Sequence, residues 1–349
     1  MNIRITSKRS KIRHKYRRFC FMSEPGDLAI FLNCPLEYLE SIALNPPYNY
    51  FQMPKKSGGM RDIESPDKPL MDLLKKINSY LQSVYYFFQT DAAYGFVINC
   101  KRDASFARNI LTNAQQHLLN PYLLNIDLKD FFHQIETERL VELFMKVPFN
   151  FSNELAILLS KLCTNNGRLP MGAPTSPCLS NWVSISLDNE LLDFGKRNLI
   201  RYTRYADDLS FSSVSELNEE YLNQIRLILR SHQFEMNTDK TKFYNKDDIR
   251  VVTGLELHEK VQVPSHYFDV LSEDLKNLKS IYQMHGKLGF VNKNFWLEKV
   301  EQRVAGKINF LGFVYGYDSI EYEHFINEYE NVLNSISEYD QISWLDFPY

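Results

Sequence analysis

The chain has 349 residues, of which 44% are hydrophobic and 24% are charged, and its formal net charge is −3. These proportions are typical of a folded protein with a sizeable core divided into two or three subdomains. They exclude a low-complexity chain, and no apolar run approaches the roughly 18 residues that a membrane-spanning helix needs.

The cysteine pattern and the N-terminal sequence indicate the cellular compartment in which we expect the protein. The five cysteines are widely separated and none forms a C-x-x-C pair, so we expect neither a zinc site nor a disulfide framework. A reducing cytoplasm fits this pattern. The basic N-terminus lacks the apolar segment of a secretory signal, and we expect the protein to stay where it is made.

Charge is distributed unevenly along the chain. Residues 1–23 hold eight Lys and Arg and no acid, whereas residues 317–349 hold eight acids and no Lys or Arg. Such ends either meet each other or meet different partners. The alternative is that both ends are solvated and partly disordered, although the acidic segment has helical periodicity.

The first predicted elements lead from helix to strand to helix. Residues 27–44 read as a short amphipathic helix that ends before Pro46. A strand at 48–53 leads into a hairpin at 54–63, which has a glycine turn and basic flanks. Apolar spacing then predicts a helix over 68–88.

The middle of the chain alternates helices with a buried strand at 122–126. A loop rich in Gly and Pro, residues 167–177, opens a helix that runs to about Gly195. Helices are also expected at 105–119, 136–146, 152–163 and 217–232. Strands are expected near 249–257 and through Val263, and from Tyr267 onward the chain reads as helical.

Residues 199–213, LIRYTRYADDLSFSS, predict a β-hairpin with two adjacent carboxylates at its tip. Neighbouring side chains on a strand point to opposite faces, so only at a turn can Asp207 and Asp208 both approach one site. Like charges held together are costly, and a bound divalent cation removes that cost. The alternative for an isolated Asp-Asp pair is a solvated turn.

Asp127 closes the hydrophobic strand at 122–126. It either caps the segment that follows or joins Asp207 and Asp208 as a third ligand of a metal pair. Mg²⁺ suits such a set, because it takes few protein carboxylates and fills its coordination with water and substrate phosphates. Two such ions would activate an attacking 3′ hydroxyl and stabilise a departing pyrophosphate.

Several segments together resemble a known family. The strand ending in Asp127, the loop LPMGAPTSP at 169–177 and Tyr205–Asp208 occur in the order and rough spacing of the reverse transcriptases. Residues 113–117, NAQQH, match the Asn-Ala-x-x-His signature of the bacterial retron type, and residues 252–254 match its Val-Thr-Gly signature. The resemblance covers roughly residues 48–316.

The resemblance implies an α+β right-hand polymerase, with fingers, palm and thumb and an antiparallel palm sheet. The implied domains are a basic arm and helix at 1–47, fingers with the retron-type motif at 48–121, a palm with interleaved fingers helices at 122–265, a helical thumb at 266–316 and an acidic tail at 317–349. Thumb cations available to phosphates would be Lys276, Lys279, Lys287, Lys293, Lys299, Arg303 and Lys307.

Carried over to this chain, the family's catalytic residues are the metal ligands Asp127, Asp207 and Asp208, and Lys240, which would protonate the leaving pyrophosphate. A surface turn is the alternative for residues 237–242. Phe132 would crowd the sugar 2′ position and favour deoxynucleotides, with Phe131 as a competing candidate.

Other residues are implied to hold the nucleotide and the primer. Arg61 and Lys55 or Lys56 would grip the incoming triphosphate from the fingers hairpin. Gly172 would let the loop backbone lie against the base pair, and Met171 stands beside it where the family usually has Gln. Tyr205 would pack near the primer end.

The two retron signatures are implied to contact RNA. On a helix, Asn113 and His117 share one face and could reach a folded RNA together. The alternative is a buried histidine bonded to backbone. Val252, Thr253 and Gly254 would lie on a strand, where Gly254 allows close approach of another backbone or of the primer–template.

The function implied is RNA-templated DNA synthesis with two Mg²⁺ ions and deoxynucleotide triphosphates, in the bacterial cytoplasm. A dedicated structured non-coding RNA would serve as template and primer, giving a branched RNA–DNA hybrid (msDNA) in anti-phage defence with an effector protein. The alternatives are a group II intron-like or abortive-infection reverse transcriptase, and a catalytically silent RNA-binding scaffold.

Overall fold

The structure, a computed structural model, describes residues 8–54, 58–98, 107–285 and 295–334. The chain divides into two compact units, residues 1–248 and 249–349, and each is described by itself. Among the helices of these described ranges, none is long and apolar enough to cross a membrane.

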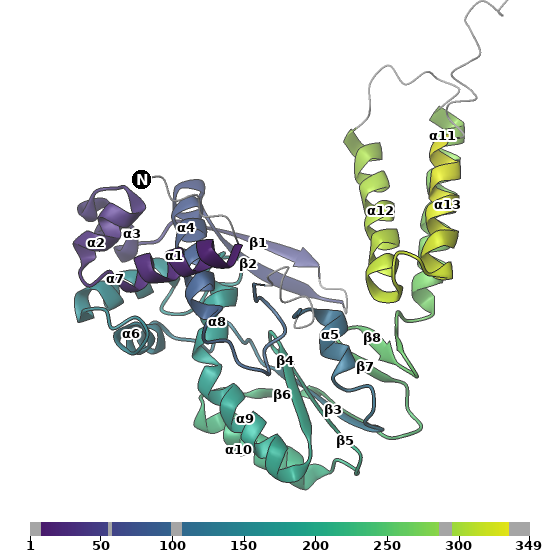
Figure 1. The fold of residues 1–349 in the computed structure, drawn as a ribbon. Coiled ribbons are helices and arrows are strands. Elements are labelled where there is room, and N and C mark those ends of the chain that lie inside the picture. Colours follow the sequence, from purple (N-terminus) through teal and green to yellow (C-terminus); the bar gives the residue numbers. More distant parts are fainter. Residues whose placement is uncertain (1–7, 55–57, 99–106, 286–294, 335–349) are drawn as a thin grey trace, which may run out of the picture. The chain divides into compact units, whose positions relative to one another are not determined.

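The first unit contains a four-stranded antiparallel sheet in the order β4–β5–β3–β6 (Figure 1). This sheet confirms the predicted α+β class and the predicted hairpin. Strand β6 was not expected, because its polar sequence NTDKTK is typical of a surface turn. The strands are β3 (Tyr122–Leu128), β4 (Arg201–Tyr205), β5 (Asp208–Ser213) and β6 (Met236–Tyr244).

Helices pack beside this sheet. The segment expected to form one helix after the 167–177 loop forms α8 (Ser176–Val183) and α9 (Ile185–Asn198). Helix α9 contacts β4 and lies side by side with α10 (Glu219–Ser231) (Figure 1). Apolar residues such as Leu187, Leu191 and Leu229 are buried on the inner faces of these helices, which fixes the helices to the core of this unit.

A two-stranded antiparallel hairpin, β1 (Tyr48–Pro54) and β2 (Met60–Pro66), precedes helix α4 (Lys68–Tyr85), as the sequence predicts. The Asp67 side chain begins α4 by accepting the Leu70 backbone N–H at 3.0 Å. The remaining helices of this part are α5 (Ile110–Gln115), α6 (Thr137–Met145) and α7 (Asn153–Cys163).

The N-terminal segment is helical. Helix α1 (Lys8–Cys20) lies within the basic arm, for which partial disorder was one of the two alternatives. The single helix expected at 27–44 is instead α2 (Pro25–Leu32) and α3 (Leu36–Leu44), because Asn33 adopts a left-handed φ of 60° and Pro35 follows it. A left-handed residue ends a helix, and Pro cannot continue one.

Within residues 249–285 and 295–334, the second unit contains a small antiparallel sheet in the order β7–β8–β9 and the helices α11, α12 and α13. Asp274 on α11 forms ion pairs with Lys307 at 2.5 Å and with Arg303 at 3.4 Å, so these two cations of the predicted thumb share one carboxylate within the unit. The elements are β7 (Arg250–Val252), β8 (Leu255–Leu257), β9 (Val261–Gln262), α11 (His266–His285), α12 (Phe295–Tyr315) and α13 (Ile320–Asn334).

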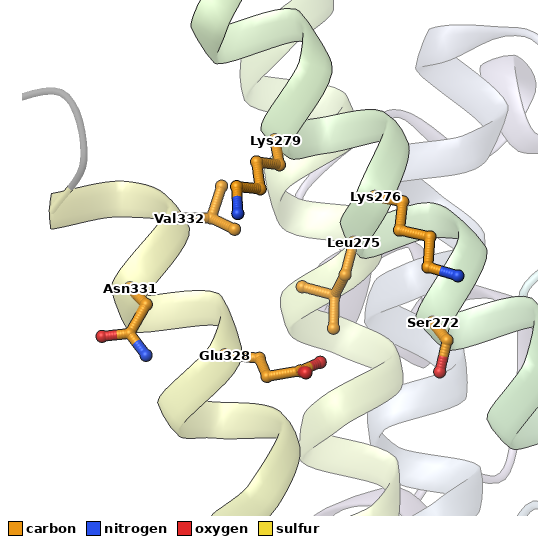
Figure 2. Close-up of a pocket in the computed structure, with 7 residues that line it drawn as sticks. All are labelled: Ser272, Leu275, Lys276, Lys279, Glu328, Asn331 and Val332. Atoms are coloured by element: carbon orange, nitrogen blue, oxygen red, sulfur yellow. The ribbon is translucent and has the colours of Figure 1, made fainter.

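Helices α11 and α13 flank a hollow of about 470 Å³ (Figure 2). Leu275 and Val332 form its apolar part, and Glu328 lies on the α13 side. Lys276 and Lys279, two of the cations expected to meet phosphates, line it from α11 and are exposed. Ser272 and Asn331 complete the lining.

Candidate active site

Strand pairing brings the predicted catalytic aspartates together. Strand β3 pairs with β5 in a register that sets Asp127 opposite Asp208. Residues directly opposite in an antiparallel pair have Cα atoms about 4.5–5.5 Å apart. Asp207 lies in the turn between β4 and β5, next to Ala206, whose φ of 58° is left-handed. The three aspartates therefore share one end of the sheet.

The electrostatics of the aspartates reflect this proximity. Burial, followed by the Asp127 carboxylate, raises the pKa of Asp207 above its usual range, against the opposing charges of Lys240 and Arg61. Burial, followed by Asp207 and Asp127, raises the pKa of Asp208 to about 7. Although neighbouring protein atoms surround part of Asp208, the residue still has surface exposed to water. Water therefore screens part of the repulsion between Asp208 and the other two aspartates.

Lys240, on the unexpected strand β6, reaches the same cluster. Its Nζ donates to Asp127 Oδ1 at 2.8 Å, and Asn237 Nδ2 donates to the same oxygen at 3.3 Å. The hydrogen bond to Asp127 raises the pKa of Lys240, which keeps the ammonium charged. A surface turn for residues 237–242 is therefore wrong, and the lysine lies at the carboxylates.

Whether these residues fit a metal depends on their donors. In the ranges that the structure describes, no three His, Cys, Asp or Glu side chains are arranged as a ready metal site. Asp127 Oδ1 accepts hydrogen bonds from Lys240 and Asn237. The donor set itself fits, because carboxylate oxygens are the ligands that Mg²⁺ prefers and one lysine does not balance three carboxylates.

We expect Asp208→Asn to stabilise the metal-free protein at alkaline pH. Because the pKa of Asp208 rises from 3.8 to about 7 on folding, the wild type loses stability as the pH increases between these two values. In EDTA, the variant should therefore melt at a higher temperature than the wild type at about pH 8 and at the same temperature at about pH 4. Thermal melting across pH, with the exposed Asp239→Asn as control, measures this. If the variant and the wild type melted at the same temperature at both pH values, the prediction would be contradicted.

The predicted nucleotide-binding residues of the fingers are only partly described. Arg61 is exposed on β2, and its charge acts on Asp207. Lys55 and Lys56 lie outside the described residues. Half-buried Phe132 packs beside Phe131, their ring centroids 5.6 Å apart, whereas Phe131 is buried. Of these two candidates for the sugar contact, only Phe132 presents an accessible ring.

Sequence reasoning missed Phe96, which lies beside two predicted site residues. Its ring centroid is 6.5 Å from that of Phe132 and 6.4 Å from that of Tyr205. Phe96 is 38% exposed and has a left-handed φ of 59°. A bulky residue rarely adopts that conformation, and no sequence pattern signals it here.

The loop with Met171 and Gly172 packs against β2. The Met171 carbonyl accepts the Glu64 backbone N–H at 2.8 Å. Gly172 has a φ of +140°, and a Cβ there would lie 2.6 Å from the Glu64 carbonyl oxygen. The close approach that requires glycine is therefore to the β2 backbone, whereas the sequence analysis assigned it to a base pair.

Glu64 is a further residue that sequence reasoning missed. Its side chain is 3% exposed, and its carboxylate accepts from Arg168 Nη1 at 2.7 Å and from Asn165 Nδ2 at 2.6 Å. These bonds join β2 to the start of the loop that holds Gly172. The only indication of this role in the sequence is an acidic residue in a strand, at a position whose side chain points inward.

Gly172→Ala should destabilise the first unit much more than Gly167→Ala. Both glycines have positive φ, so both substitutions strain the backbone, by about 1–2 kcal/mol. Only at position 172 would the new Cβ also overlap backbone, since a Cβ at Gly167 meets nothing within 4 Å. Urea denaturation of both variants checks this, and equal losses of stability would contradict it.

Asn113 and His117 are buried, at 1% and 0% exposure. His117 Nδ1 lies 2.7 Å from Ser212 Oγ and its Nε2 lies 2.7 Å from Thr203 Oγ1, so the ring bridges β5 and β4. Neither side chain is presented to solvent, which differs from the expectation that they face RNA. His117 is buried, as the alternative interpretation expected, but its ring nitrogens lie at side-chain hydroxyls, whereas that interpretation expected backbone partners.

The Val-Thr-Gly signature forms a turn. Val252 ends β7 and is buried, and Thr253 and Gly254, with φ of 49° and 79°, connect β7 to β8. Two successive positive φ values are the requirement of a tight hairpin turn. A Cβ at Gly254 would meet nothing within 4 Å, so the glycine serves the turn and no close approach is seen in this unit. The continuous strand expected over 249–257 is thus wrong.

A buried ion pair supports the hairpin that carries Asp207 and Asp208. Arg204, on β4, is fully buried, and its Nε and Nη2 donate to the two oxygens of Asp188 on α9 at 2.8 and 2.7 Å. Burial alone would lower the pKa of Arg204, but the Asp188 carboxylate raises it overall. Arg204 Nη1 also donates to the Ala206 carbonyl at 3.1 Å and to Asn181 Oδ1 at 3.0 Å. The guanidinium therefore holds the turn that carries Asp207.

Comparisons with known proteins agree with this geometry. Residues 53–315 match the family described as reverse transcriptase (RNA-dependent DNA polymerase). The retron Ec83 reverse transcriptase of Escherichia coli is 29% identical over 280 residues, which cover 73% of this chain and 86% of that protein. The retron Mx65 reverse transcriptase of Myxococcus xanthus is 30% identical over 258 residues, covering 66% and 57%.

Among solved structures, a telomerase from Candida albicans in complex with a TWJ fragment of telomeric RNA matches with a TM-score of 0.44. The two sequences are 13% identical, and the match covers 85% of this chain and 65% of that chain.

Proposed function

The chain belongs to the reverse transcriptase family and is of the retron type, an RNA-directed DNA polymerase, and from this premise we propose that it copies a dedicated structured non-coding RNA into DNA. The product would be a branched RNA–DNA hybrid. The observation that supports catalysis best is the register that sets Asp127 opposite Asp208, beside Asp207.

The three aspartates would hold two Mg²⁺ ions. When bound, such ions supply charge neutralisation, activation of the attacking hydroxyl and stabilisation of the leaving pyrophosphate. The protein's part is to fix the carboxylates on paired strands, so that no reorganisation is needed when the substrate binds. The intact set argues against a catalytically silent scaffold.

Lys240 would act on the leaving group. Its ammonium is charged and lies at the Asp127 carboxylate. With 59% of its side chain exposed, it can move from Asp127 toward a phosphate oxygen without unfolding anything around it. There it would donate a proton to the pyrophosphate oxygen as the bond to the α-phosphorus breaks.

The fingers would bind the incoming nucleotide. Arg61 has a guanidinium fork suited to phosphate oxygens, and its charge already acts on Asp207. Lys55 or Lys56 would assist it, and Met171 and Gly172 would line the nucleotide position from the loop bonded to β2. Tyr205 would lie near the primer end.

The domain boundaries drawn from the sequence remain part of the proposal: arm at 1–47, fingers at 48–121, palm at 122–265, thumb at 266–316 and tail at 317–349. RNA contacts would come from the surfaces that surround the buried residues Asn113 and His117, and from the turn at Val252, Thr253 and Gly254. The same resemblance supports an effector partner, anti-phage defence and a cytoplasmic location.

The nucleic acid that copurifies with the protein tests this function. We expect sequencing to find one structured RNA and a DNA complementary to part of it, joined at an internal guanosine 2′ oxygen. An RNA without attached DNA would support the scaffold instead. A spliced intron RNA would support the group II intron-like alternative.

Phe132→Ala should relax the choice of sugar. A ring against the ribose would clash with a 2′ hydroxyl and tolerate hydrogen, so its removal should lower the preference for deoxynucleotides by about tenfold or more. Primer extension with each nucleotide class measures the ratio of kcat/KM values. Phe96→Ala, which removes the neighbouring ring, is the control, and an equal change in both variants would contradict the assignment.

A further inference from the structure

Helix α1 carries a charge pattern that nucleotidyl transfer does not explain. It has seven Lys and Arg among its 13 residues and no acid in its first turn. Cations near the N-terminus of a helix oppose its dipole, so Arg9 and Lys11 do not serve the stability of the helix. We therefore asked what the helix is anchored to and what it presents.

The apolar face of α1 is fully used by the fold. Ile12 and Phe19 are buried, and the helix packs across α4 (Figure 1). The Phe19 ring packs at 5.7 Å from Phe31 and at 5.8 Å from Phe151. Tyr16 packs at 5.2 Å from Phe87. A helix whose apolar face is buried in a protein core has none left to insert into a membrane.

The outer face of α1 presents unneutralised positive charge. Arg9, Lys11, Arg13 and Arg17 are exposed, and none forms an ion pair with another residue in the described ranges. Elsewhere in this unit, three exposed lysines pair with an acid one helical turn away: Lys68 with Asp72, Lys146 with Glu142 and Lys196 with Asp193. Without such partners, the α1 cations repel one another, and a polyanion would relieve that repulsion.

Aromatic rings border two further cations of α1, Lys15 and Arg18. Lys15 Nζ lies 5.2 Å from the centroid of Tyr80, and Arg18 Cζ lies 5.6 Å from that of Phe31. Just after the helix, Phe21 is 88% exposed. Cations that meet phosphates beside a ring that can stack on an unpaired base are the combination used by proteins that bind single-stranded or looped RNA.

We propose that the exposed surface of α1, where Arg9, Arg13 and Arg17 share one side at four-residue spacing and Lys11 projects from another side, forms with the ring of Phe21 an RNA-binding surface that contacts the phosphodiester backbone independently of sequence. The helix is about 20 Å long, which is enough to follow several successive phosphates. This site rests on the proposed function for the kind of nucleic acid, and it involves none of the residues assigned to catalysis. It would hold the structured RNA while its template end is copied.

A charge-matched pair of variants tests the surface. In the first, Arg9, Lys11, Arg13 and Arg17 are replaced by Ala; in the control, Lys146, Lys161, Lys196 and Arg197, exposed on other helices of the same unit, are replaced by Ala. Both variants lose four positive charges. Fluorescence anisotropy then measures the Kd of the full chain for a labelled RNA hairpin with an unpaired loop, at about 50–200 mM KCl.

We expect the α1 variant to bind at least about tenfold more weakly than the wild type at the lowest salt, and its slope of log K against log [KCl] to be shallower by about 2–4, because each lost phosphate contact releases about one counterion fewer. Phe21→Ala should weaken binding to the unpaired loop and leave binding to a blunt RNA duplex unchanged. The control variant should change Kd less than about twofold.

Equal weakening in both quadruple variants, or none in the α1 variant, overturns the proposal. Loss of binding to phosphatidylserine vesicles with unchanged RNA affinity also overturns it, in favour of a membrane surface. Extension of oligo(dT) on poly(rA) by the wild type separates the two claims. Failure there removes the proposed function, whereas the comparison of RNA affinities still decides the surface.

Discussion

Replacing both Asp207 and Asp208 with Asn should abolish DNA synthesis and leave RNA binding intact. Asn keeps the size of each side chain but removes the negative charges that would hold divalent ions. Metal ions supply several kcal/mol of transition-state stabilisation, so the rate should fall at least about a thousandfold. Primer extension on poly(rA)/oligo(dT) measures the rate, and anisotropy with a labelled RNA measures binding.

The control for this prediction is a double variant of exposed acids in the same unit, Asp239→Asn with Asp247→Asn. It changes the net charge equally and should extend the primer at nearly the wild-type rate. The removal of two repelling carboxylates should also leave the Asp207→Asn/Asp208→Asn variant folded, because both groups have raised pKa values. Synthesis that survives in this variant would remove the site assignment.

The second large effect concerns stability. Asp188→Asn should destabilise the first unit by about 3–5 kcal/mol, because it leaves the Arg204 guanidinium buried without its counter-charge. Both side chains are fully buried. Tyr202 and Thr90 also donate to Asp188, at 3.0 and 2.9 Å, and an amide cannot replace both oxygens as acceptors.

Asp193→Asn is the matched control for this second prediction. Asp193 lies on the same helix and pairs with Lys196, but the side chains of both residues in this pair are exposed. An exposed pair is worth about 0–1 kcal/mol. Urea denaturation should therefore separate the two variants by several kcal/mol. Because Arg204 also bonds the Ala206 carbonyl, Asp188→Asn should slow DNA synthesis at temperatures where it remains folded. Equal stability of the two variants would refute the role of the buried pair.

Local patterns in the sequence predicted the elements that carry the chemistry. Two runs of strand-forming residues around a polar break predicted the hairpin with Asp207 and Asp208, and an apolar run predicted the strand that ends in Asp127. The resemblance placed Lys240 beside them. Its strand, β6, was missed because its side chains are mostly exposed and polar, so nothing in the alternation marks it.

Other features depend on contacts that a linear pattern does not contain. The burial of His117 follows from hydroxyls that β4 and β5 present to it, about 90 residues further along the chain. The requirement for Gly172 follows from the approach of the Glu64 backbone. The left-handed conformation of Phe96 has no signal in its residue type, whereas that of Asn33 at the end of α2 is of a kind that Asn adopts several-fold more often than most residues.

Anomalous diffraction from crystals grown with Mn²⁺, a primer–template and a non-hydrolysable nucleotide would test the central claim most directly. We expect Mn²⁺ peaks within bonding distance of Asp127, Asp207 and Asp208, with the Lys240 ammonium moved from Asp127 to the nucleotide phosphates. Asp127 still bonded to Lys240, with no Mn²⁺ between β3 and the β4–β5 turn, would contradict the account.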